Sequence, residues 1–156
     1  MQISSIHEIK QELANATPQQ LTGLCLRLAR FKQENKALLS YLLFQAGDEA
    51  DYIEGIKQEI AEQFTTINTS TPYFIKKSLR KIIRIINRHA TYSGIKTTET
   101  ELRIYFCQQF IQAGMHLYKS KVLQSIYDAQ VRKIKTVVKG LHEDLRHDYL
   151  RMLDEY

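Results

Sequence analysis

Apolar residues recur every three or four positions along most of this 156-residue chain. That spacing places them on one face of an α-helix, whereas a half-buried β-strand would alternate apolar and polar residues. Only six glycines and two prolines interrupt the pattern, and Leu, Ile, Lys, Gln and Glu are plentiful. The sequence therefore predicts an all-α protein of about eight helices in hairpins, with little or no sheet.

Three helices are predicted in the first third of the chain. Ser5 with Glu8, and Thr17 with Gln20, match the capping box that begins a helix. A third helix, over residues 33–46, carries apolar residues in nearly every direction around its axis. These residues are Leu38, Leu39, Tyr41, Leu42, Leu43 and Phe44. We therefore expect the third helix to be central and buried.

A fourth helix is predicted from Asp48, which can cap its start, to about Phe64. One face of this helix is apolar and the other is acidic, a pattern typical of an amphipathic helix. The apolar face is formed by Tyr52, Ile53, Ile56, Ile60 and Phe64, and the acidic face by Asp48, Asp51, Glu54, Glu59 and Glu62.

Segment 65–72, "TTINTSTP", combines β-branched residues with Asn and Ser and ends in a proline. This composition disfavours helix, and it makes the segment the best candidate for an internal boundary. We interpret the segment as a hinge between two half-cores rather than as a break between domains. The length of the chain suits one all-helical domain spanning residues 1–156.

A fifth helix, over residues 73–89, separates its charged residues from its apolar residues almost completely. Ile75, Leu79, Ile82, Ile83 and Ile86 fall on one side, and Lys76, Lys77, Arg80, Lys81, Arg84 and Arg88 on the other. We expect residues 89–98, "HATYSGIKTT", to form a loop. Thr98 with Glu101 then matches a capping box that begins a sixth helix.

The sixth helix is again apolar over most of its circumference, and two further helices are predicted over residues 120–139 and 141–155. Hairpins of this kind can stack into a short α-solenoid-like array or close into an irregular helical bundle. The pattern is similar to that of HEAT-type and tetratricopeptide-type arrays. Their signature residues are missing, so the likeness implies no function.

Composition narrows the class of protein further. Hydrophobic residues make up 44% of the chain and charged residues 25%, as in an ordinary folded protein. The N-terminus lacks a secretory signal, and no stretch approaches the ~20 apolar residues that span a bilayer. We therefore expect a cytoplasmic protein that does not enter a membrane. Cys25 and Cys107 lack the spacing of a zinc site or a redox pair, and we expect both in the core.

The motifs of several common chemistries are missing. The sequence has no phosphate-binding loop, no dinucleotide-binding glycine motif and no nucleophile elbow. His142 and His147 in "HEDLRH" are five positions apart, about 140° around a helix, so they do not share a metal ion from one face. We expect no enzymatic activity, no cofactor and no metal.

Charge is the one unusual feature of the sequence. Residues 63–98 hold seven Lys or Arg and no Asp or Glu, in a chain whose net charge is +5. If the basic helix packs through its apolar face, cations at the edges of its polar face (Lys76, Lys81 and Arg88) can reach carboxylates of neighbouring helices. Cations near the centre of that face (Lys77, Arg80 and Arg84) point outwards. The predicted anion-binding residues are Lys77, Arg80, Lys81, Arg84 and Arg88.

Two functions are consistent with this pattern. The main prediction is a non-enzymatic protein-interaction or scaffolding module with an unknown protein partner. The alternative is the binding of nucleic acid or another polyanion through the basic helix 73–89. We rank this alternative second because the overall charge is modest and aromatic stacking platforms are missing. The oligomeric state does not follow from the sequence.

Overall fold

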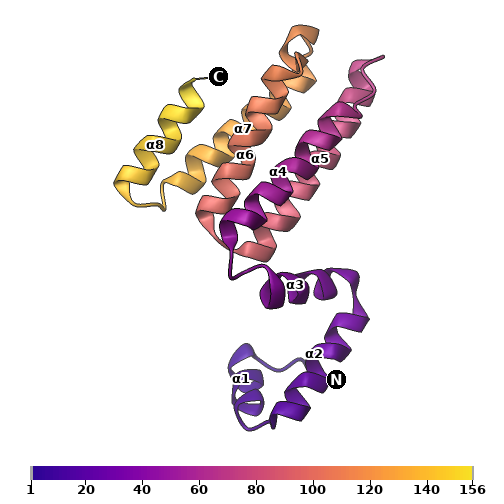
Figure 1. The fold of residues 1–156 in the computed structure, drawn as a ribbon, viewed down its shortest axis with the longest axis vertical. Coiled ribbons are helices and arrows are strands. Elements are labelled where there is room, and N and C mark those ends of the chain that lie inside the picture. Colours follow the sequence, from indigo (N-terminus) through magenta and orange to yellow (C-terminus); the bar gives the residue numbers. More distant parts are fainter. Residues whose placement is uncertain (1, 156) are drawn as a thin grey trace. The chain divides into compact units, whose positions relative to one another are not determined.

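The computed structural model describes residues 2–155, which form eight α-helices, one short 3-10 helix and no strand (Figure 1). This confirms the predicted all-α class. The helices are α1 (Ile6–Ala14), α2 (Pro18–Phe31), α3 (Gln33–Phe44), α4 (Glu49–Thr65), α5 (Pro72–Ser93), α6 (Lys96–Gln112), η1 (Met115–Tyr118), α7 (Lys121–Val138) and α8 (Glu143–Asp154). The arrangement is compatible with a helical bundle or array.

The helices belong to two compact units. The N-terminal unit, Met1–Phe44, contains α1 to α3, and the C-terminal unit, Gln45–Tyr156, contains α4 to α8. Segment 65–72 lies inside the C-terminal unit, where it connects α4 to α5. The single domain and the hinge at this segment stay predictions.

Side-chain caps determine where several helices begin. Ser5 Oγ accepts the Glu8 N–H at 3.3 Å, and Glu8 Oε2 accepts the Ser5 N–H at 2.7 Å, which confirms the first capping box. Thr17 and Gln20 form the second box through bonds of 3.2 and 2.8 Å. Asp48 caps α4 as predicted. These starts depend on residues three positions apart, so local sequence is sufficient to define them.

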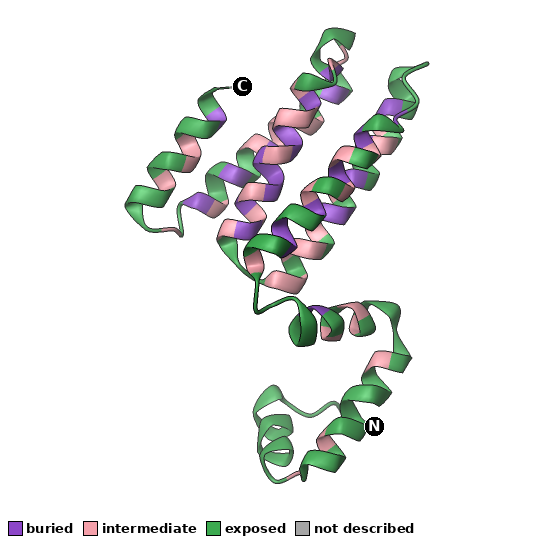
Figure 2. Ribbon diagram, in the orientation of Figure 1, coloured by how far each residue is buried: buried purple, intermediate pink, exposed green. Residues whose placement is uncertain are grey.

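The core of the C-terminal unit surrounds α6. This helix packs against α4, α5, α7 and α8 (Figure 1), and it buries side chains around most of its circumference (Figure 2), as predicted. Its largest buried side chains are Phe106 and Phe110. The predicted apolar face of α4 is confirmed, because all five of its members are buried: Tyr52, Ile53, Ile56, Ile60 and Phe64.

The predicted loop at residues 89–98 is wrong. α5 continues through Ser93, Gly94 ends it in the left-handed conformation with φ 67°, and α6 begins at Lys96. Glycine adopts this conformation without the steric cost of a Cβ, so two residues are enough to reverse the chain.

The predicted capping box of Thr98 with Glu101 is also wrong. Ile95 occupies the cap position and makes no side-chain capping bond. Thr98 is instead buried within α6, where its hydroxyl donates to Glu49 Oε1 at 2.5 Å. Ser93 Oγ donates to the same carboxylate oxygen at 2.5 Å. The start of α6 is therefore held by a carboxylate of α4 rather than by a local cap.

The prediction that the third helix is central and buried is wrong as well. Tyr41 is the one residue that α3 buries, whereas Leu42, Leu43 and Phe44 are 56%, 64% and 82% exposed. α3 packs along α2 within a unit of three helices. Three helices are too few to cover every side of one of them, so most of its apolar circumference stays exposed.

The two cysteines differ in their surroundings. Cys107 is buried as predicted, but Cys25 is exposed, so its predicted place in the core is wrong. Burial raises the pKa of the Cys107 thiol to about 12. Cys107 therefore behaves as a small apolar core residue at neutral pH. Cys25 lies on α2, a helix with no buried residue.

Candidate functional site

The N-terminal unit exposes most of its large apolar side chains. α1 and α2 bury none of their residues, and exposed residues predominate along all three helices (Figure 2). The exposed side chains are Ile3, Ile6, Ile9, Leu13, Leu24, Leu26, Leu28, Phe31, Leu38, Leu42, Leu43 and Phe44, which we call the apolar surface. Large exposed apolar patches mark interaction sites, because a folded chain normally buries such side chains.

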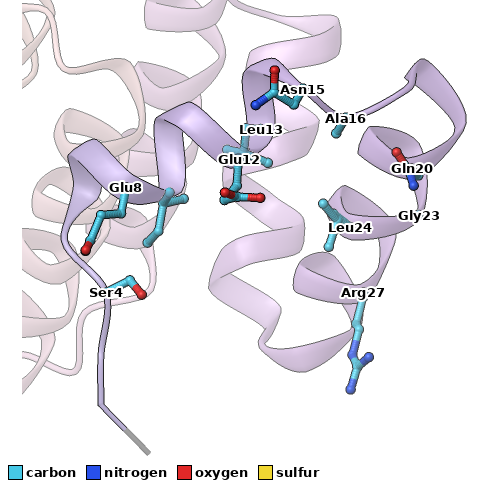
Figure 3. Close-up of a pocket in the computed structure, with 11 residues that line it drawn as sticks. Ser4, Glu8, Glu12, Leu13, Asn15, Ala16, Gln20, Gly23, Leu24 and Arg27 are labelled. Carbon is cyan, nitrogen blue, oxygen red and sulfur yellow. The ribbon is translucent and has the colours of Figure 1, made fainter.

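A groove of about 830 Å³ lies between α1 and α2 within the apolar surface (Figure 3). Its apolar lining consists of Ile9, Leu13, Ala16 and Leu24. Glu8 and Glu12 line it from α1, and Arg27 lines it from α2. Figure 3 shows that both helices contribute side chains, so the groove depends on the α1–α2 hairpin.

A second groove, of about 620 Å³, lies between α2 and α3. Leu26, Ala29, Phe31, Leu39, Leu43 and Phe44 form its apolar lining, and Arg30, Lys32, Gln33, Lys36 and Ser40 its polar lining. A single residue, Lys32, separates the two helices, and its backbone is extended with φ −143°. Asn35 Nδ2 donates to Leu28 O at 2.8 Å and so links the start of α3 to the end of α2.

The predicted anion-binding residues all lie on α5, and all of them are exposed. Lys77, Arg80, Lys81 and Arg84 have no carboxylate within 4.0 Å among the residues that the structure describes. Their positive charges are therefore left to solvent. Whether they bind an anion stays a prediction.

The cations at the edges of this face differ from one another. Arg88 Nη2 lies 3.9 Å from Glu59 Oε1 of α4, a long and exposed ion pair worth little energy. Lys76 Nζ instead lies over the ring of Tyr73, 5.2 Å from its centroid. Arg88 therefore pairs with a carboxylate of a neighbouring helix, as expected for a cation at the edge of the polar face. Lys81, at the same edge position, has no ion pair within residues 2–155.

The positive charge of α5 extends onto α7. Arg80 and Lys121 both line a groove of about 430 Å³ between these helices. The rest of its lining is uncharged: Ile83, Val122, Ser125, Ile126, Ala129 and Gln130. We call Lys77, Arg80, Lys81, Arg84 and Lys121 the basic surface. It is the part of the C-terminal unit best suited to hold an anion.

A buried polar cluster joins α5, α6 and α7, and sequence reasoning missed it. Arg103 is 2% exposed. Its guanidinium donates to Glu99 Oε1 at 2.6 and 2.9 Å, to Gln130 Oε1 at 2.7 Å and to Asn87 Oδ1 at 2.9 Å. In the sequence, the one indication of this cluster is that Arg103 stands among the apolar residues of the sixth helix. Because the cluster satisfies a buried charge and connects three helices, we assign it a role in stability.

His89 of α5 is half-buried between α4 and its own helix. Its Nδ1 lies 2.7 Å from the hydroxyl of Tyr52, and its Nε2 lies 3.6 Å from Glu59 Oε2, beyond hydrogen-bonding distance. Burial, with the adjacent Arg88 charge, lowers the pKa of His89 to about 4. The imidazole is therefore neutral at physiological pH.

Mild acid is expected to destabilise the protein through His89. Between pH 4 and 6.5 the unfolded chain binds more protons than the folded one, because folding lowers the pKa of His89 from 6.5 to about 4. The contribution is complete above pH 6.5 and is lost as the pH falls towards 4. Since the side chain is partly exposed and screened, we expect a loss of at most about 2 kcal/mol.

Urea denaturation at about pH 7.5 and about pH 4.5 measures this loss. The matched variant is His89→Gln, which keeps a hydrogen-bonding group near Tyr52 but does not titrate. We expect its free energy of unfolding to change less between the two pH values than that of the wild type. An equal change in both proteins would contradict the assignment to His89.

The described residues offer few other sites. Within residues 2–155 no three side chains of His, Cys, Asp or Glu come together as metal ligands would. None of the described helices is both long and apolar enough to cross a bilayer. Comparison of the chain with protein-family models, with curated proteins and with solved structures found no match.

Proposed function

We propose that this protein is a non-enzymatic protein-interaction module that binds a partner through the apolar surface of its N-terminal unit. The observation that supports this most strongly is the exposure of apolar side chains on helices that have almost no core. Ile6 is 81% exposed, Phe31 75% and Phe44 82%. Leaving such side chains in water costs free energy that a partner's apolar surface would recover.

The size of the surface supports a stable complex. Twelve large side chains, each at least 37% exposed, belong to the apolar surface. Their combined exposed area is on the order of 1,000 Å², comparable to the roughly 800 Å² that each partner buries in a standard interface. The two grooves make parts of this surface concave, as is typical of binding sites.

Site-specific photo-crosslinking tests the proposal. A photoreactive phenylalanine analogue replaces Phe44, and in a control protein it replaces Tyr73 of α5, which is 60% exposed. In cells that produce the protein, we expect one discrete protein adduct from position 44 that is missing from position 73. Leu43→Asp should remove the adduct and leave the circular dichroism spectrum unchanged, since Leu43 is 64% exposed. Identical adduct patterns from both positions would contradict the proposal.

We propose polyanion binding as a second function, because the cations of the basic surface lack carboxylate partners. Lys77, Arg80 and Arg84 point away from the core on exposed turns of α5. Several such cations together release counterions when they bind phosphates, and this gives salt-dependent affinity for nucleic acid or heparin.

Replacing Lys77, Arg80 and Arg84 together with glutamine is expected to weaken retention on heparin. The dissociation constant for a single-stranded oligonucleotide should rise by about tenfold or more, because three phosphate contacts are lost. The matched control replaces three exposed cations outside the basic surface and the two N-terminal grooves, Lys10, Lys133 and Lys139, with glutamine and so removes the same charge. If both triple variants elute at the same salt concentration, the basic surface is not a specific anion site.

A further inference from the structure

The groove between α2 and α3 differs from the α1–α2 groove in its charge. The ionisable side chains that line it are Arg30, Lys32 and Lys36, and no carboxylate does so. None of these three cations forms an ion pair with a described residue. In contrast, Glu8 and Glu12 line the α1–α2 groove. The α2–α3 groove therefore combines an apolar lining with an unneutralised positive edge.

The dimensions of this groove suit a helix. α2 has 14 residues and α3 has 12 residues. The groove is lined along α3 from Gln33 to Phe44, roughly 18 Å at about 1.5 Å per residue, and along α2 from Leu26 to Phe31, roughly 9 Å. It therefore has one wall of about three helical turns and one shorter wall of about one and a half turns. The apolar lining consists of three leucines, one alanine and two phenylalanines, and of these Leu26 is 46% and Leu43 64% exposed. An amphipathic helix fills such a groove with side chains at positions i, i+3, i+4 and i+7.

The positive charge of the α2–α3 groove favours one of three candidate occupants: a second copy of the groove, nucleic acid or a partner's helix. A second copy of the groove, paired symmetrically, would bring Arg30, Lys32 and Lys36 against the same three cations. Nucleic acid would also bring phosphates to these cations, but four of the six apolar lining residues are leucine or alanine, so most of the apolar lining offers bases no aromatic ring to stack on. An amphipathic helix with a carboxylate-rich polar face matches both the mainly aliphatic lining and the positive edge.

We infer that the α2–α3 groove binds an acidic amphipathic helix of a partner protein. Its apolar residues pack on Leu26, Leu39 and Leu43, and its Asp or Glu side chains pair with the three cations at the edge. This inference rests on the proposed function, since it names the partner class for one part of the apolar surface.

Fluorescence anisotropy with three labelled synthetic helices tests the inference on the full chain. The acidic probe carries Leu at i, i+3, i+4 and i+7 and Glu on the opposite face. The basic probe carries Lys in place of Glu, and the polar acidic probe carries Gln in place of Leu. We expect the acidic probe to bind at least about tenfold more tightly than either of the others. Equal binding of the acidic and basic probes would overturn the inference.

Two charge-reversal variants separate the groove from the basic surface. Arg30→Glu with Lys36→Glu should raise the dissociation constant of the acidic probe by about tenfold and improve binding of the basic probe. Lys77→Glu with Lys81→Glu makes the same charge change on α5 and should alter binding of the acidic probe by less than about threefold. All four positions are exposed, so neither variant removes a buried contact. If the α5 variant has the larger effect, the probe binds the basic surface and the inference fails.

Failure of this inference and failure of the proposed function give different results. If photo-crosslinking at Phe44 yields a partner but the acidic probe shows no preference, the protein-binding function stands and the partner class is wrong. If position 44 yields no discrete adduct and none of the three probes binds, both proposals fail.

Discussion

Replacing Phe106 with alanine is expected to lower the free energy of unfolding by about 3–5 kcal/mol. Phe106 is 0% exposed, and its ring centroid lies 5.6 Å from that of Phe64 and 6.3 Å from that of Phe110. Truncation removes the ring contacts between α6 and α4 and leaves a cavity in the core of the C-terminal unit. Urea denaturation followed by circular dichroism measures the change.

Phe44→Ala provides the matched control, because it deletes the same ring from a side chain that is 82% exposed. We expect the free energy of unfolding to change by no more than about 0.5 kcal/mol. A loss as large as that of Phe106→Ala would mean that Phe44 is part of a core, and it would remove the main observation behind the proposed protein-binding function.

Arg103→Ala is expected to lower the free energy of unfolding by about 3 kcal/mol. The guanidinium is the common donor to Glu99 of its own helix, Gln130 of α7 and Asn87 of α5. Its removal leaves the buried Gln130 Oε1 without a donor and the Glu99 carboxylate without its counter-charge. The loss is measured by urea denaturation at neutral pH.

Arg84→Ala is the control for Arg103→Ala. Arg84 is an exposed arginine of α5 without an ion pair within residues 2–155, so we expect its loss to change the free energy of unfolding by at most about 0.5 kcal/mol. Glu99→Gln should lower the free energy of unfolding by more than Arg84→Ala and by less than Arg103→Ala. The amide still accepts hydrogen bonds from Arg103, but the negative charge is lost. Equal stability of the Arg84 and Arg103 variants would show that the buried cluster does not stabilise the fold.

The two proposed binding surfaces predict different responses to salt. Binding through the apolar surface depends mainly on removing apolar side chains from water, and moderate salt changes this only weakly. Binding through the basic surface depends on counterion release, and its affinity falls steeply as salt rises. A partner that remains bound at high salt therefore points to the apolar surface, and one that is released points to the basic surface.

The features that the sequence predicts correctly depend on residues close together in the chain. The capping boxes of Ser5 and Thr17 involve a residue three positions further on, and a helix forms them without help from the rest of the protein. The same applies to the apolar face of α4, because helical periodicity alone places its members together. The orientation of the basic face of α5 follows from the same geometry: Lys77, Arg80 and Arg84 are exposed as expected.

The errors concern features that depend on partners distant in sequence. Thr98 was predicted to cap a helix, but it is buried within α6, where Glu49 of α4 accepts a hydrogen bond from its hydroxyl. The buried cluster of Arg103 was not predicted at all, because it requires Asn87 and Gln130 from two other helices. Leu43 was predicted to lie in the core, but it is exposed because few helices surround α3.

The sequence by itself thus determined the helical class, the starts of the helices that a local side chain caps, and the charged faces of α4 and α5, because backbone periodicity and capping act within a few residues. The tertiary structure decided which apolar faces are covered. The burial of a side chain depends on how many helices pack around it, and that number is large around α6 and small around α3. The exposure of the α5 cations in the basic surface was therefore predictable, whereas the proximity of Lys121 to them and the apolar surface of the N-terminal unit became visible only in the tertiary structure.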